Sequence, residues 1–93
     1  DKKTRQVIVK AGYEKNIIHR TGHGLGITGH EAPYVALGDR RRLEPGMLIS
    51  IEPGIYIPGE GGYRHSDSVL ITDRGYIRLT DAPDSLDNVT IRI

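Results

Sequence analysis

Apolar residues follow different spacings along this chain, and each spacing predicts its own kind of element. From Lys2 to Ala11 they recur at three- and four-residue intervals, with no glycine or proline between them. This periodicity predicts a short helix, with Gly12 in position to cap its end. Residues 20 to 46 contain six glycines and two prolines and keep no sustained period, so they predict loops with short extended pieces.

Isoleucine-rich segments bounded by proline and glycine predict strands in the second half of the chain. Met47 to Ile57 is expected to form a strand that is interrupted at Pro53-Gly54. A second strand is expected from Tyr63 to Thr72, and the turn Asp73 to Gly75 joins it to a third strand from Tyr76 to Thr80. Strands joined by such short turns run antiparallel to one another.

The tail that begins at Pro83 also carries a strand pattern. Val89, Ile91 and Ile93 alternate with other residues, which predicts an additional edge strand. A chain of 93 residues forms one domain at most. The expected fold class is therefore α+β, a mostly antiparallel sheet with a flanking N-terminal helix.

Composition narrows the range of partners and compartments. Thirteen Lys and Arg against twelve Asp and Glu leave a net charge of +1, which gives no general attraction to nucleic acid or to an anionic membrane. The absence of cysteine excludes disulfides and thiolate metal sites. No signal peptide and no long apolar span is found. We expect a soluble, cytoplasmic protein that binds neither nucleic acid nor a membrane.

Three of the four histidines lie within twelve residues, at His19, His23 and His30, and glycines separate them. Histidine titrates near neutral pH and is the commonest metal ligand, so this segment is a candidate site for chemistry. The glycines make a helical zinc motif improbable here. The stretch Gly24 to Gly29 matches a dinucleotide-binding fingerprint, but that motif requires a helix directly after it, which Pro33 opposes.

A carboxylate lies in the middle of the first isoleucine-rich strand. Side chains alternate between the two faces of a strand, so Ser50 and Glu52 share one face, and Arg64 and Ser66 share a face of the next strand. A carboxylate at such a position is costly to bury unless it is paired or metal-bound. Three interpretations stay open: a metal ligand, an ion pair between Glu52 and Arg64, or an edge position open to water.

Five short motifs occur in a fixed order from residue 19 to residue 64. They are His19-Arg20-Thr21-Gly22-His23-Gly24-Leu25-Gly26, His30-Glu31-Ala32-Pro33-Tyr34, Leu43-Glu44-Pro45-Gly46-Met47, Ile51-Glu52-Pro53-Gly54-Ile55-Tyr56 and Gly62-Tyr63-Arg64. Together they resemble the C-terminal half of the creatinase/aminopeptidase family, the M24-type peptidases with the pita-bread fold. The likeness is closest to the Xaa-Pro peptidase branch, which includes prolidase and aminopeptidase P.

This resemblance implies a role for each matching residue. His23 and Glu52 match metal ligands, and Glu52 also matches the residue that handles the proton of the metal-bound water. His30 matches the catalytic histidine that binds the substrate carbonyl as charge develops on it. His19 and Arg64 match residues that bind substrate and shuttle protons. The implied cofactor is a pair of divalent ions, and imidazole and carboxylate ligands suit Mn, Co or Zn.

One residue departs from the family pattern inside the expected site. The family's second glutamate ligand falls two residues after the arginine, and here that place holds Ser66, whose neutral hydroxyl is a far poorer bridging ligand. Asp67 could substitute only if the strand is bulged, because it is expected on the opposite face. His65 shares that opposite face, so a structural interaction between His65 and Asp67 is the simpler expectation.

The resemblance also implies that residues 1–93 form the C-terminal fragment of a pita-bread catalytic domain. The family's two aspartate ligands lie upstream of the histidine, whereas Asp1 and Glu14 are the only acids before His19 and match no motif. We expect the chain to pack against the missing N-terminal half, or against a copy of itself as a homo-oligomer, because half of this fold would expose a sheet edge and an apolar face.

Three functions are compatible with these residues. The first is a metal-dependent exopeptidase or dipeptidase that hydrolyses Xaa-Pro bonds, of which this chain is an incomplete part and is inactive alone. The second is a metal-independent or altered hydrolase that acts on a small amide or amidine. The third is a noncatalytic pita-bread module that binds a peptide or another protein. The retained histidines and Glu52 favour an enzyme, and Ser66 favours the second and third hypotheses.

Overall fold

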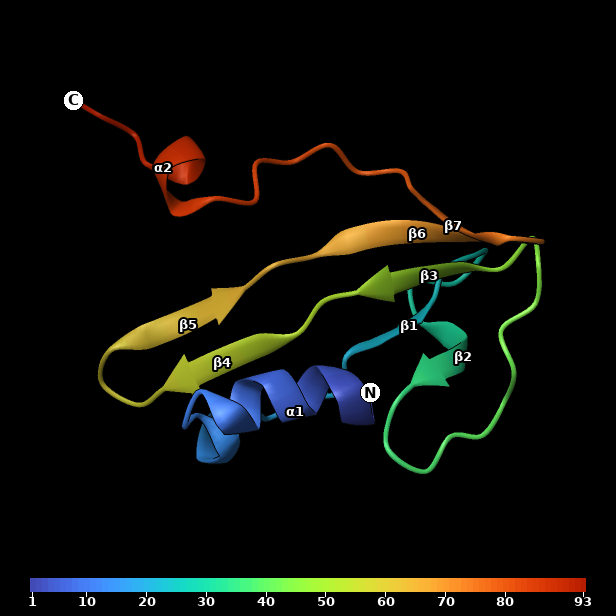
Figure 1. The fold of residues 1–93 in the computed structure, drawn as a ribbon, viewed down its shortest axis with the longest axis horizontal. Helices are drawn as coiled ribbons and strands as arrows, with labels where there is room; N and C mark the ends of the chain where they lie inside the picture. Colours follow the sequence, from blue (N-terminus) through green and yellow to red (C-terminus); the bar gives the residue numbers. More distant parts are fainter.

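A helix lies beside a long, bent antiparallel sheet in the computed structural model, which describes residues 1–93 (Figure 1). The elements in chain order are α1 (Lys2–Lys10), a 3₁₀ turn (Glu14–Asn16), β1 (Gly22–Gly24), β2 (Glu31–Val35), β3 (Leu48–Ile51), β4 (Gly54–Ile57), β5 (Gly61–Arg64), β6 (Asp67–Thr72), β7 (Gly75–Arg78) and α2 (Leu86–Val89). Five strands form one sheet in the order β2-β1-β3-β6-β7, and β4 pairs with β5 in a second. The expected antiparallel sheet and N-terminal helix are thus confirmed.

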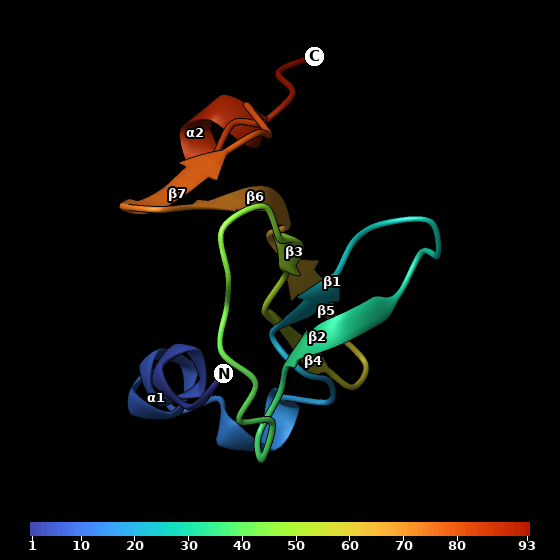
Figure 2. The ribbon, with the colours of Figure 1, turned by 90° about the vertical axis from the view of Figure 1, so that its right-hand side faces the viewer.

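The N-terminal helix ends one residue earlier than predicted. Gly12 follows it with a φ of 90°, a left-handed conformation that favours glycine. Residues Val7 and Ile8 of α1 face Ile55 of β4 across a cavity of about 360 Å³. Figure 2 shows the helix on the side of β4 and β5, away from β6 and β7. Neither helix is long and apolar enough to cross a membrane.

Both long strands break at the same level. β3 gives way to β4 at Pro53, which has no N–H to donate to the strand ladder, as the sequence predicts. The expected strand from Tyr63 to Thr72 is also divided, into β5 and β6. Figure 1 shows β3 continuing into β4 and β5 into β6, so the two sheets form one bent ribbon.

The register is the same on both sides of this break. The flanking pairs are Ser50 with Ser68 and Gly54 with Arg64. In an antiparallel pair, one step forward on one strand is matched by one step back on the other. The same register continued through the break therefore places Glu52 opposite Ser66. Arg64 pairs with Gly54, and the ion pair between Glu52 and Arg64, one of the three interpretations left open, is absent.

The C-terminal tail differs from its prediction. Val89 ends the short helix α2, and Ile91 and Ile93 pair with no strand, so the predicted edge strand is wrong. The physical reason is local capping: the Ser85 side chain accepts a hydrogen bond from the Asn88 backbone N–H, which favours a helical turn over an extended chain.

One face of the sheet is apolar and open. Ile49 and Val69 are the two buried apolar residues of the core, and the groove beside them has a volume of about 440 Å³. Ile51 and Ile71 line the same groove. The expected exposed apolar face is therefore present, on the side of the sheet that Asp67 also faces.

A small polar cluster lies at the break between β5 and β6. His65 Nε2 lies 2.9 Å from Asp67 Oδ2, and the Thr80 hydroxyl donates a hydrogen bond to Asp67 Oδ1. The Thr80 hydrogen bond, followed by the His65 interaction, holds the pKa of Asp67 below its ordinary value. The expected contact between His65 and Asp67 is confirmed. Asp67 lies on the face opposite Glu52 and Ser66, so it does not take the place of the family's second glutamate.

Replacing Gly22 by alanine tests how closely β1 approaches β3. A Cβ at Gly22 would lie 1.8 Å from the Ser50 carbonyl oxygen, so the two backbones must separate. We expect Gly22→Ala to lower the free energy of unfolding by about 2 kcal/mol or more. Gly29→Ala is the matched control, because nothing lies within 4 Å of its Cβ. Equal denaturation midpoints for the two variants would contradict the close approach.

Replacing Thr80 tests the cluster at Asp67. Because the folded-state pKa of Asp67 is lowered, its stabilising contribution is present above the unfolded-state pKa and is lost as pH falls through the folded-state pKa. Thr80→Val removes the donated hydrogen bond, so the Asp67 pKa should rise toward its ordinary value, whereas Thr80→Ser should preserve it. A carboxyl-carbon NMR titration measures the pKa. An unchanged titration in Thr80→Val would show that the hydroxyl contributes nothing.

Candidate metal centre

Three potential ligand groups converge at the end of β3. They are His23 of β1, His30 directly before β2, and Glu52 directly after β3, and one ligand atom of each lies within 4.8 Å of the others. His23 is buried, Glu52 is half-buried and His30 is exposed. This arrangement combines two imidazoles with a carboxylate, a ligand set that divalent transition metals accept.

Hydrogen bonding prepares His23 to act as a ligand. Its Nδ1 lies 2.9 Å from the Gly24 carbonyl oxygen, which can only accept, so Nδ1 carries a proton and Nε2 is the nitrogen directed at Glu52. Nε2 lies 3.3 Å from Glu52 Oε1. A proton on Nε2 or a metal cation would each hold the imidazole and the carboxylate together at this position. The orientation of His23 by a backbone carbonyl is typical of metal-bound histidine.

The backbone around His23 is held from two sides. Its N–H donates to the Ser50 hydroxyl at 3.0 Å, and the Glu52 N–H donates to the Thr21 carbonyl oxygen at 2.6 Å. Both bonds connect β1 to the end of β3, the two segments that carry the ligands. His23 and Glu52 are therefore positioned by the same strand contact.

His30 lies closer to His23 than its predicted role at the substrate carbonyl requires. Its ring centroid is 4.0 Å from that of His23. The resemblance assigns His30 to the substrate carbonyl, and the geometry brings the ring within reach of the cation site as well. Its exposure leaves it open to an incoming substrate.

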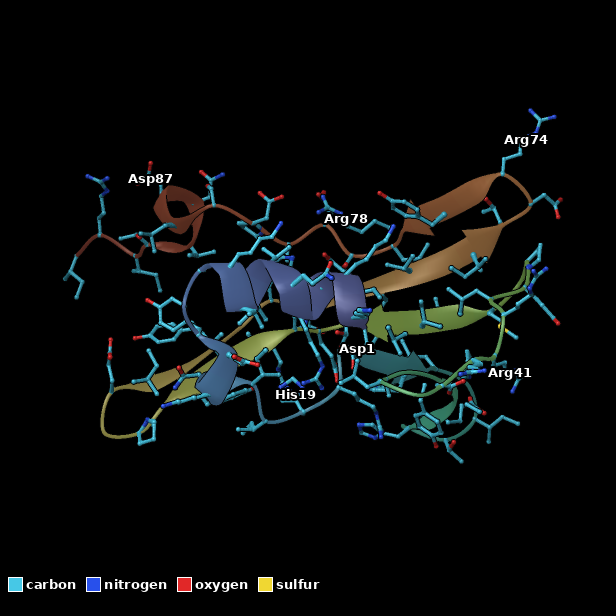
Figure 3. All side chains as sticks on the ribbon, turned by 60° about the horizontal axis from the view of Figure 1, so that its bottom comes forward. Asp1, His19, Arg41, Arg74, Arg78 and Asp87 are labelled. Atoms are coloured by element: carbon cyan, nitrogen blue, oxygen red, sulfur yellow. The ribbon has the colours of Figure 1, made fainter.

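His19 lies at the site but outside this cluster. Its Nδ1 donates to the Arg20 carbonyl oxygen at 2.7 Å, so Nε2 accepts from the Tyr56 hydroxyl at 2.8 Å. Its own carbonyl accepts from the Arg5 guanidinium of α1 at 3.2 Å. Figure 3 shows His19 in the loop that follows α1. With both ring nitrogens engaged, His19 reaches a ligand only if its bond to Tyr56 opens.

The five residues that the sequence singled out for chemistry line one cavity. It has a volume of about 470 Å³, and its lining residues are His19, Arg20, His23, His30, Ala36, Glu52 and Arg64. Ser66 does not line it. The cavity contains one carboxylate, that of Glu52.

The motif pattern did not identify two side chains that shape this site. Tyr56 binds His19, and the Arg20 guanidinium lies 4.4 Å above the Tyr34 ring. Both Tyr56 and Arg20 fall inside the quoted motifs, so their position was a usable signal. Their partners come from other elements and follow only from the fold.

Known proteins share both the sequence and the fold. The chain is 44% identical over 86 residues to "Probable dipeptidase PepE" of Mycobacterium tuberculosis, covering 92% of this chain and 23% of that protein. It is 49% identical over 80 residues to the "Xaa-Pro dipeptidase" of Pyrococcus furiosus, covering 86% of this chain and 23% of that protein. The chain thus spans about a quarter of the length of these relatives.

Solved structures agree with this comparison. A dipeptidase from Pyrococcus horikoshii superimposes with a TM-score of 0.86 at 48% identity, over 89% of this chain and 23% of that one. The prolidase from Pyrococcus furiosus gives a TM-score of 0.83 at 48% identity, over 86% of this chain and 24% of that one. The predicted match to part of a pita-bread prolidase is confirmed.

A family assignment follows from a separate match. Residues 1–73 match the sequence pattern described as "Metallopeptidase family M24". This segment contains His23, His30 and Glu52, the residues whose ligand atoms converge. The family implies divalent metal ions, and the donor set of the cluster fits them. The chain belongs to metallopeptidase family M24.

Proposed function

We propose that the complete protein is a metal-dependent dipeptidase that hydrolyses Xaa-Pro bonds. The observation that carries the proposal is the convergence of His23, His30 and Glu52 in a cavity of a size suited to a small ligand. The relatives named Xaa-Pro dipeptidase, with 45% and 49% identity, support the substrate class. The chain matches about a quarter of such a protein, and the proposed activity is that of the complete protein.

Each residue has a task in this reaction. His23 Nε2 and a Glu52 oxygen would hold a divalent cation, and such a cation would polarise the substrate carbonyl and lower the pKa of water. Glu52 accepts a proton from the attacking water at its carboxylate. His30 donates a hydrogen bond to the carbonyl oxygen as negative charge develops there. The water oxygen bonds to the carbonyl carbon, the C–N bond breaks, and the proline nitrogen takes the proton that Glu52 accepted from the water.

Two ions of Mn, Co or Zn are the cofactor that we propose for the complete protein. Imidazole and carboxylate donors suit all three metals. Ser66 lies opposite Glu52 in the strand register, where a carboxylate could bridge two ions. Its neutral hydroxyl is a poorer bridging ligand than a carboxylate. Any further carboxylates must come from outside this chain, because Glu52 is the only one at the cavity.

Ser66 is the specific observation that favours a second candidate. With a hydroxyl in place of a bridging carboxylate, the same cavity could host an altered hydrolase that acts on a small amide or amidine without two metal ions. Metal content separates the two candidates. The convergence of two imidazoles and a carboxylate within 4.8 Å favours the metal-dependent enzyme.

The apolar face and the composition suggest the surroundings of the chain. We propose that the groove lined by Ile51 and Ile71 packs against the rest of the polypeptide, and that the complete protein assembles with a copy of itself. The absence of cysteine suits a reducing compartment, and we propose the cytoplasm. The remaining partner is the peptide substrate.

Replacing His23 tests the proposed function. His23→Ala in the complete protein removes the oriented Nε2 ligand, so bound metal and hydrolysis of Ala-Pro should both fall at least about 100-fold. Elemental analysis and a proline-release assay measure the two quantities. His65→Ala is the matched control, because His65 contacts Asp67 outside the cavity. A metal-free wild-type protein that hydrolyses Ala-Pro would refute the metal-dependent mechanism.

Replacing Ser66 tests whether a carboxylate at this position strengthens cation binding. Ser66→Glu places a carboxylate opposite Glu52, so divalent cations should bind at least about tenfold more tightly in calorimetric titrations. Asn88→Glu adds the same charge in the exposed C-terminal tail and should leave binding unchanged. Equal affinities in the two variants would show that Ser66 does not face the cation site.

A further inference from the structure

We propose that Arg20 binds a carboxylate of the peptide substrate and thereby determines which peptides the site accepts. This inference rests on the proposed peptidase function for its substrate class. It concerns a residue to which neither the motif pattern nor the metal cluster gives a role. The observations that carry it are the unmatched charge of Arg20, its contact with Tyr34 and its place in the cavity.

The positive charge of Arg20 has no partner within the chain. The close contacts between basic and acidic side chains are Arg5 with Asp1, His23 with Glu52, His65 with Asp67, and Arg78 with Asp84. Arg20 takes part in none of them, and its guanidinium donates no hydrogen bond to the protein. A guanidinium stays charged at any physiological pH and offers five N–H donors in a fixed fork. Arg20 therefore keeps its full capacity to bind an anion.

An aromatic contact holds the guanidinium in place without neutralising it. The Arg20 Cζ lies 4.4 Å from the centroid of the Tyr34 ring, within the range of a cation–π interaction. The backbone of Tyr34 is anchored, since its N–H donates to Asp39 Oδ2 at 3.1 Å. Stacking on a ring leaves the edge of the guanidinium plane free for hydrogen bonds. Arg20 is thus oriented before any ligand arrives.

A hydrogen bond to His19 also fixes the backbone of Arg20 beside the cavity. Its carbonyl oxygen accepts the Nδ1 proton of His19 at 2.7 Å, and its side chain lines the same cavity as His23, Glu52 and Arg64. A group bound by Arg20 therefore lies in the cavity that contains the candidate metal ligands.

The charges around the cavity favour an anionic ligand. Glu52 supplies its one carboxylate and already faces His23 Nε2 at 3.3 Å. Arg20 and Arg64 bring two permanent positive charges, and Arg64 also has no ion pair. A bidentate carboxylate is the planar anion that matches an arginine fork.

A peptide can supply this carboxylate from two sources. One is its C-terminal carboxylate, which lies one residue beyond the scissile bond in a dipeptide. The other is the side chain of an acidic residue. The chemistry recognised by Arg20 is the same in both cases, so the choice of peptides must separate them.

The experiment compares four peptides in the complete protein and three variants. Ala-Pro and Ala-Pro amide differ in the C-terminal carboxylate, and Glu-Pro and Gln-Pro differ in the acidic side chain. Arg20→Gln removes the charge at similar length, and Arg20→Lys keeps the charge but loses the fork. Arg42→Gln is the control, since Arg42 is exposed and lies outside the cavity. Kinetics give kcat/KM, and calorimetry without added metal gives binding.

If Arg20 holds the C-terminal carboxylate, Arg20→Gln lowers binding and kcat/KM of Ala-Pro roughly 10- to 100-fold and leaves Ala-Pro amide unchanged. If it holds an acidic side chain, the wild-type preference for Glu-Pro over Gln-Pro is lost by a similar factor, whereas Ala-Pro is unaffected. In either case Arg20→Lys retains part of the discrimination. Arg42→Gln behaves as wild type.

The proposal is overturned if Arg20→Gln leaves both discriminations intact, or if it weakens all four peptides equally. If all four peptides weaken equally, thermal unfolding shows whether Arg20→Gln has misfolded. In that case Arg20→Lys decides the role of Arg20: the proposal stands if this variant still discriminates between the paired peptides and fails if it does not. Failure of the peptidase proposal has a different signature. A wild-type protein that hydrolyses none of the peptides refutes the peptidase, and the binding measurements still decide the role of Arg20.

Discussion

The close approach of β1 to β3 is the constraint on which the site depends. Gly22 lies so near the Ser50 carbonyl that a side chain at this position would collide with the backbone. The approach allows the Ser50 hydroxyl to receive the His23 N–H and the Thr21 carbonyl to receive the Glu52 N–H. His23 and Glu52 are consequently fixed to one another through backbone contacts, without relying on long flexible side chains.

The break in the sheet then determines what faces the cluster. Pro53 ends the ladder of β3, and the preserved register puts Ser66 opposite Glu52. Asp67, the neighbouring acid, is held by His65 and Thr80 on the other face. A strand alternates its side chains strictly, so a carboxylate one residue away cannot replace one that is missing. The strand register therefore places a hydroxyl, and no second carboxylate, opposite Glu52.

The cavity combines this cluster with unbalanced positive charge. Arg20 and Arg64 line it without carboxylate partners, and the single acid, Glu52, is directed at His23. The candidate metal ligands and the unpaired Arg20 therefore line one cavity, and the Arg20 guanidinium lies over the face of the Tyr34 ring.

The sequence by itself determined the helix, the antiparallel strands, the interruption at Pro53 and the family, because periodicity, proline and motif order are local properties of the chain. It also placed His19, His23, His30, Glu52 and Arg64 together, through a resemblance whose functional roles stay predictions. The tertiary structure alone decided the pairing of Arg64 with Gly54, the contact of Tyr56 with His19 and the stacking of Arg20 on Tyr34. Those contacts join residues from different elements. Their partners depend on strand register and loop path, which a residue pattern does not specify.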